Sequence, residues 1–129
     1  MEPVSPIFQA PITLTLLVLT IITSVRAFYN PVLMHYFKFN PYYVSQKNEV
    51  HRLFTSGFVH VDWLHLGFNM YVMWNFGQIL EMDDRYLGHI GLITIYLVSL
   101  PISDLPSLIR YRDSEFYNSM GASGAISAL

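Results

Sequence analysis

The charged residues of this chain are few and clustered, and they leave stretches long enough to cross a lipid bilayer. Charged side chains make up 12% of the 129 residues, against roughly 25% in an average soluble domain. Residues 3–25, 63–80 and 86–103 contain no Asp, Glu, Lys or Arg, and 12–25 is the densest apolar part of the first stretch. A spanning helix needs about 20 such residues. We therefore predict an all-α, polytopic transmembrane helix bundle with three full spans and the start of a fourth at about Met120.

The first apolar stretch also fits a secretory signal peptide, which is apolar and N-terminal. A signal peptide begins with basic residues, whereas Glu2 is the only charged side chain before Arg26. We therefore favour a spanning helix over a signal peptide.

Composition also limits the partners and the chemistry. The chain has no cysteine, which excludes disulfides, thiol catalysis and cysteine-ligated metal. A net charge of −2 without a basic run predicts no nucleic-acid partner.

The segment 26–52, between the first two spans, is unusually aromatic for a connecting loop. It holds two Asn-Pro pairs, four Lys or Arg, and seven Phe or Tyr. Aromatic rings and Lys side chains favour the membrane–water boundary, so short helices lying in the interface are expected. An ordinary packed loop is the alternative.

Polar residues in and just before the second span are the first functional candidates. An ionisable group in hydrocarbon costs a few kcal/mol, so His60, Asp62, His65 and Asn69 each need an internal partner or a polar cavity. His65 and Asn69 are four residues apart and share a helix face, whereas His60 is about 140° away around an ideal helix. His60, His65 and Asn69 therefore do not form a single metal-binding face. A metal site needs three or four ligands, and only Asp62 and His89 remain as additional ones, so we expect no metal. Hydrogen bonds that merely hold helices together are the alternative.

The sequence ends in GASGAISAL, where Ser123 stands at the head of an apolar run. Small residues at spacings of three and four let a helix approach its neighbour closely, so Ser123 fits a packing motif as one more small residue. A serine at the start of a helix also lies where backbone N–H groups and the helix dipole favour an oxyanion.

Two strings, HRLFTSGFVHVDWLHLGFNM and GASGAISAL, together resemble the rhomboid family of intramembrane serine proteases. The matching features are an Arg before the second span, a His-x4-His-x3-Asn pattern, a Gly-x3-Glu pattern near the end of that span, and Gly-x-Ser-Gly opening the fourth: Arg52, His60, His65, Asn69, Gly77, Glu81, Gly121, Ser123 and Gly124.

The resemblance implies a role for each of these positions. Ser123 is the expected nucleophile, and His65 and Asn69 are expected to stabilise the oxyanion with the Ser123 backbone N–H. The supporting residues are His60, Gly121, Gly124 and Arg52. Segment 26–52 becomes the family's partly embedded first loop, and 1–129 becomes an incomplete rhomboid-like transmembrane domain. The implied reaction is hydrolysis of a peptide bond in or beside a transmembrane segment through an acyl-enzyme. Transmembrane proteins are the expected substrates, with the lipid bilayer as surroundings and no cofactor.

The resemblance also leaves a gap in the site, since the family's general base is a histidine on the sixth span. We therefore interpret the sequence as a fragment of a longer rhomboid, which would be nearly inactive alone. His65 could act as the base instead, but this alternative is weaker because the resemblance assigns His65 to the oxyanion. A catalytically inactive rhomboid-like protein that binds transmembrane helices is the alternative. A third reading is an unrelated helical membrane protein with a structural polar cluster.

Orientation is the point on which the sequence conflicts with the family. Four Lys or Arg in the first loop and two in the third predict that these loops are cytoplasmic, whereas rhomboids direct the first loop outward. We follow the motif and expect a multi-pass integral protein of the plasma or an inner membrane.

Overall fold

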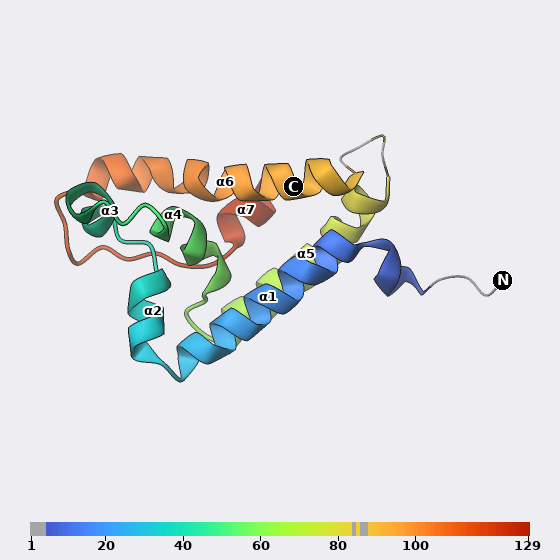
Figure 1. Cartoon of the computed structure of the whole chain (residues 1–129), viewed down its shortest axis with the longest axis horizontal. Coiled ribbons are helices and arrows are strands. Elements are labelled where there is room, and N and C mark those ends of the chain that lie inside the picture. The colour runs from blue at the N-terminus through green and yellow to red at the C-terminus, as the bar shows by residue number, and fades with distance from the viewer. Residues whose placement is uncertain (1–4, 84, 86–87) are drawn as a thin grey trace.

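A computed structural model describes residues 5–83, 85 and 88–129 of the protein. Three long helices dominate it, and they are α1 (Pro11–Phe28), α5 (Trp63–Met82) and α6 (Gly88–Tyr111) (Figure 1). The short elements are 3-10 helices η1 (Pro6–Gln9) and η2 (Ser56–Phe58) and α-helices α2 (Pro31–Phe37), α3 (Pro41–Lys47), α4 (Arg52–Thr55) and α7 (Ser123–Ser127). Over these described ranges there is no strand, and one isolated antiparallel bridge pairs Phe39 with Ser119. The all-α prediction is confirmed.

Helices α1 and α5 lie side by side and antiparallel (Figure 1), held by the Gly-x3-Glu pattern. The buried carboxylate of Glu81 accepts hydrogen bonds from the backbone nitrogens of Ile12 and Thr13, each at 2.7 Å. These N–H groups belong to the first turn of α1 and have no partner within that helix, so an anion is stabilising there. One turn earlier, a Cβ atom on Gly77 would lie 2.8 Å from Thr13 Cγ2, which shows how closely the two backbones approach.

Two of the long helices, α1 and α6, are long and apolar enough to cross a membrane by length and composition. Helix α5 has 20 residues, which is enough to span, but it carries more polar side chains, so its crossing stays a prediction. The third span was expected over 86–103, whereas α6 begins at Gly88 and runs on to Tyr111, through Pro101 and Pro106. Prolines are tolerated inside spanning helices, where they do not force the helix to end.

The first loop contains two short helices with the same start signal. Asn30 and Asn40 cap α2 and α3, since each side-chain oxygen accepts from a backbone N–H three residues later, Leu33 at 3.1 Å and Tyr43 at 3.2 Å. A proline occupies the first helical position in both, where its missing N–H costs nothing. The expectation of short helices is thus confirmed, and their place in the membrane interface stays a prediction.

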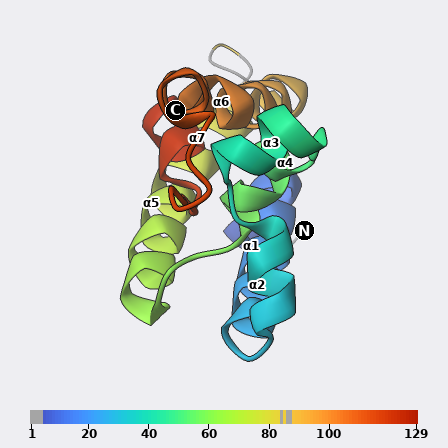
Figure 2. The ribbon, with the colours of Figure 1, turned by 90° about the vertical axis from the view of Figure 1, so that its left-hand side faces the viewer.

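The hydrophobic core joins all three long helices to the C-terminal segment. Its buried members are Leu16, Leu17, Leu66, Met70, Met73, Tyr96, Leu100, Ala122 and Ala125. Figure 2 shows α7 between α5 and α6, and both helices pack against it. Because Ala122 and Ala125 are buried in this core, the start of α7 has a fixed place against the three long helices.

Candidate active site

Ser123 and Asn69 reach one cavity from two different helices. The cavity has a volume of about 380 Å³ and lies between α5 and α7. Ser123 is the first residue of α7 and its side chain is exposed. The remaining lining residues are mostly apolar: Phe68, Val72, Phe76, Ile126, Ser127 and Leu129. The predicted nucleophile and one predicted oxyanion donor therefore face the same space.

The side-chain amide of Asn69 is a buried donor in this cavity. The residue is 3% exposed, and its Nδ2 atom has no hydrogen-bond partner among the described residues. A buried donor without a partner costs about 1–3 kcal/mol, so native proteins rarely keep one without a reason. An oxygen atom of a bound ligand would satisfy it.

His65 lies one turn before Asn69, against the backbone of Gly121. A Cβ atom on Gly121 would lie 2.7 Å from His65 Cε1, and the φ angle of Gly121 is +114°. Both facts require glycine at this position. The carboxylate of Asp62, considered above as a metal ligand, caps α5 by accepting from the His65 backbone nitrogen at 2.7 Å.

His60 forms a buried chain of hydrogen bonds that ends at the residue before Ser123. Its Nε2 accepts from the Ala122 backbone nitrogen at 3.2 Å, and its Nδ1 lies 3.0 Å from Ser24 Oγ on α1. Since Nε2 accepts, the proton of the neutral ring is on Nδ1 and is donated to Ser24. The Ser24 hydroxyl in turn donates to the Phe58 carbonyl at 3.0 Å. Burial, followed by the nearby His65, lowers the pKa of His60 to about 4. This ring is therefore a neutral part of the scaffold.

The segment that enters α7 is held from the other side as well. The Gly121 backbone nitrogen donates to the Ser56 carbonyl at 2.9 Å. A Cβ atom on Gly124 would collide with the side chain of Ser103 on α6, so these helices pack as closely as the small-residue spacing predicts. Both ends of the short Gly-x-Ser-Gly string are thus places where a larger residue does not fit.

A comparison with known protein families identifies the chain. Residues 47–129 match the model of the Rhomboid domain, which is 83 of the 129 residues. The protein belongs to the rhomboid family. It is therefore a membrane protein, as proteins of this family are. No curated protein matches the sequence. The matched region contains every site residue discussed above except Ser24.

Arg52 of this rhomboid does not contact Ser123 in any interaction of the described residues. It is 2% exposed and donates to Glu49 and to the backbone carbonyls of His35 and Lys38, the latter at 2.9 Å. Its guanidinium also lies 4.8 Å from the centre of the Tyr43 ring. Arg52 therefore fixes the first loop, and any support that it gives to the segment around Ser123 passes through that loop.

The rhomboid site has no general base next to Ser123 within the described residues. No histidine has a hydrogen bond to Ser123 Oγ in this part of the chain, and His60 is already engaged by Ala122 and Ser24. His89, the other metal ligand considered, bonds to Glu81 at 2.7 Å.

Sequence reasoning missed two supporting residues, Ser24 and Ser56. A serine inside an apolar span needs a hydrogen-bond partner, so the position of Ser24 in the first span could have pointed to a supporting role. Ser56 acts through its backbone carbonyl, which every residue has, so nothing in the sequence indicated its role.

Proposed function

We propose that this rhomboid is an intramembrane serine endopeptidase that cleaves peptide bonds in or near the transmembrane segments of other proteins. The observation that carries the proposal is the shared cavity, in which the exposed Ser123 hydroxyl accompanies the unpaired, buried amide of Asn69. A protease needs a nucleophile and a donor for the oxyanion in one space, and those two groups meet that need.

The chemistry follows from these positions. Ser123 Oγ attacks the scissile carbonyl, its proton passes to a base, and the carbonyl oxygen becomes an oxyanion. Asn69 Nδ2, a ring N–H of His65 and the Ser123 backbone N–H are the proposed donors to that oxyanion. The last of these is at the first position of α7, where no carbonyl within the helix accepts it. Collapse of the intermediate breaks the C–N bond, and the base returns its proton to the departing amine half of the substrate. Water then hydrolyses the remaining acyl-enzyme, which releases the carboxyl half and restores the Ser123 hydroxyl.

The base is the missing partner. A serine hydroxyl is a weak nucleophile without a base in hydrogen-bond reach. We propose a histidine outside these 129 residues as the base, in keeping with the family resemblance, and not His60, whose two nitrogens are engaged.

The proposed topology is multi-pass, with α1, α5 and α6 as spans and α7 as the start of a fourth. Large apolar side chains remain exposed along all three long helices, for example Leu19 on α1, Phe68 on α5 and Ile90 on α6. Such surfaces are unfavourable in water and suit lipid or further helices. The aromatic residues of the first loop support an interfacial position.

The test is cleavage of a transmembrane reporter in proteoliposomes by protein expressed from its natural coding region. Ser123→Ala should abolish cleavage, and Ser99→Ala, a control on α6 whose hydroxyl bonds within its own helix, should leave it intact. A serine-reactive fluorophosphonate should label the wild-type protein at Ser123. Undiminished cleavage by the Ser123 variant would remove this residue from the mechanism.

One observation favours a second function, that of an inactive relative that binds transmembrane helices without cutting them. Within the described residues Ser123 has no base. If the wild-type protein neither cleaves nor reacts with the fluorophosphonate but cross-links to transmembrane peptides, the second function is the correct one.

A further inference from the structure

The segment that leads into Ser123 is paired with the first loop through the backbone. Phe39 and Ser119 exchange two backbone hydrogen bonds, at 2.9 Å and 3.0 Å, and form an isolated antiparallel bridge. Phe39 is fully buried, so water does not compete for these bonds. Ser119 precedes Ser123 by four residues. A part of the chain 80 residues earlier thus fixes the approach to the nucleophile.

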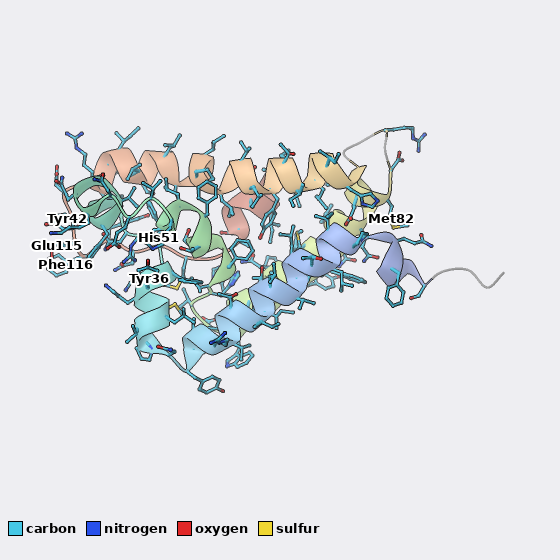
Figure 3. The ribbon with its side chains drawn as sticks, in the orientation of Figure 1. Tyr36, Tyr42, His51, Met82, Glu115 and Phe116 are labelled. Carbon is cyan, nitrogen blue, oxygen red and sulfur yellow. The ribbon has the colours of Figure 1, made fainter. Side chains whose placement is uncertain are left out.

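Asn40 adds a side-chain contact next to this bridge and serves two elements at once. Its oxygen caps α3 by accepting from the Tyr43 nitrogen at 3.2 Å. Its nitrogen donates to the Glu115 carbonyl at 2.8 Å and to Asn118 Oδ1 at 3.1 Å. In Figure 3 the labelled Glu115 and Phe116 lie next to Tyr42 of α3. Asn40 is 2% exposed, so loss of either contact leaves polar groups unpaired in the interior.

These contacts form part of a closed ring of hydrogen bonds. Arg52 donates to the Lys38 carbonyl, directly before the Phe39 bridge. Four residues after Arg52, the Ser56 carbonyl accepts from the Gly121 nitrogen. The short stretch Ser119–Gly121 is therefore held at both ends, at Ser119 by Phe39 of the first loop and at Gly121 by Ser56. Ser123 follows Gly121 by two residues.

We propose that Asn40 is a positioning residue for Ser123. It holds segment 115–119 against the first loop and thereby fixes the position of Ser123. Its catalytic consequence rests on the proposed protease function. Asn40 touches no reacting group. It acts through the bridge at Ser119 and the hydrogen bonds of Gly121 and Ala122, which fix where α7 begins.

The decisive variant is Asn40→Asp, with Asn30→Asp as the matched control. Aspartate caps a helix as well as asparagine does, so both variants keep their caps. Asn40→Asp replaces the donor to Glu115 and Asn118 with an acceptor that repels them. Asn30 lies in the same loop, and among the described residues its side chain makes no hydrogen bond except its cap to Leu33. The control therefore adds the same charge without touching the segment.

Two readouts are needed, and one does not depend on catalysis. In Asn40→Asp, amide hydrogen exchange at Gly121 and Ala122 should accelerate at least about tenfold, while exchange in α1 and α5 should stay as in the wild type. The kcat for a transmembrane reporter should fall about tenfold with KM unchanged, because the cavity residues on α5 are not altered. Asn118→Ala, which keeps the α3 cap, should show a smaller effect in the same direction, and it replaces Asn40→Asp if that variant does not fold.

The outcomes separate this proposal from the protease proposal. Equal exchange at Gly121 and Ala122 in the Asn40 and Asn30 variants overturns the positioning role. Faster exchange together with wild-type kcat overturns it too, since Ser123 would then be insensitive to the segment. A wild-type protein that neither cleaves nor labels contradicts the protease function, and exchange alone then decides whether Asn40 holds the segment.

Discussion

The imidazole Nε2 of His60 lies 3.2 Å from the backbone nitrogen of Ala122, the residue before Ser123. The bond joins residues 62 positions apart in the sequence and is fully buried. A ring nitrogen can accept a hydrogen bond from a backbone N–H only if it carries no proton. The bond from Ala122 therefore requires the neutral form of the His60 ring. The position of the segment that leads into Ser123 thus depends on the protonation state of the His60 ring.

Replacement of His60 by Phe should lower kcat while the protein still folds. Phenylalanine fills a similar volume but accepts no hydrogen bond, which leaves the buried Ala122 N–H unpaired at a cost of about 1–3 kcal/mol. We expect a loss of roughly tenfold or more in reporter cleavage. His51→Phe is the control. A phenyl ring preserves the stacking of His51 on Tyr36, and the hydrogen bond that it loses, from His51 Nε2 to the Tyr36 carbonyl, is exposed, so water can replace it. Equal activity of the two variants would contradict a role for the His60–Ala122 bond.

Acidification should destabilise the protein through His60. Its pKa is lowered from 6.5 to about 4 by burial and by His65, so the folded state favours the neutral ring. The unfolded chain takes up a proton as pH falls below 6.5 and the folded protein does so only near pH 4. The stabilisation is therefore complete above pH 6.5 and is lost as pH falls from 6.5 to 4. Unfolding measured against pH should show this slope in the wild type, and His60→Phe should lack that part of it.

Gly121→Ala should inactivate the protein, and Gly67→Ala should not. At Gly121 the added Cβ atom would lie 2.7 Å from the His65 ring, and the φ angle of +114° is strained for alanine. At Gly67, within α5, the added Cβ would meet no atom within 4 Å apart from its own stretch of helix. Alanine is the better helix former there by up to about 1 kcal/mol in water. Cleavage and thermal unfolding of both variants, measured side by side, check the contrast. An active Gly121→Ala protein would show that the loop adapts.

The sequence predicted the helical class and the close approach at Gly121 and Gly124, because charge-free stretches and small-residue spacings are local patterns. The pairs Asn30-Pro31 and Asn40-Pro41 were visible in the sequence of the first loop, but no role was predicted for them. Helix caps depend on only a few neighbouring residues, and that is why both pairs open short helices.

Long-range pairing left no such local pattern. The bridge between Phe39 and Ser119 uses backbone atoms that every residue possesses, so it could not be predicted from the residue types. The C-terminal extension of α6 was also missed, because the predicted span ended where the charge-free stretch ends, before Asp104, whereas the helix runs on to Tyr111. Arg52 was assigned a supporting role by resemblance, and its contacts show that the support goes to the first loop.

Asn69→Ala should lower kcat without raising KM. Loss of one oxyanion donor typically costs about 10²- to 10³-fold, because its hydrogen bond matters mainly once negative charge develops. Asn75→Ala is the matched control on the same helix, where the exposed amide bonds only to the Tyr71 carbonyl in the described structure. Steady-state cleavage of the reporter gives both constants. A rise in KM at unchanged kcat would place Asn69 in substrate binding and outside the oxyanion site.

Glu81→Gln should destabilise the bundle more than it alters the chemistry, because Glu81 contacts the start of α1 and not the cavity. Its two oxygens accept from Ile12 and Thr13 and from the ring of His89. In glutamine one oxygen becomes an NH₂ group that opposes these donors, and the negative charge at the start of α1 is lost. A hydrogen bond to a charged group is worth about 1.5–3 kcal/mol, and we expect a loss of unfolding free energy of that size.

The control for Glu81 is Asp83→Asn, which removes a carboxylate two residues later that pairs with the exposed Arg85. Solvent screens that pair, so its loss should change stability little. Unfolding in detergent compares the two variants. Equal stability would mean that the α1–α5 contact at Gly77 holds these helices together without the carboxylate.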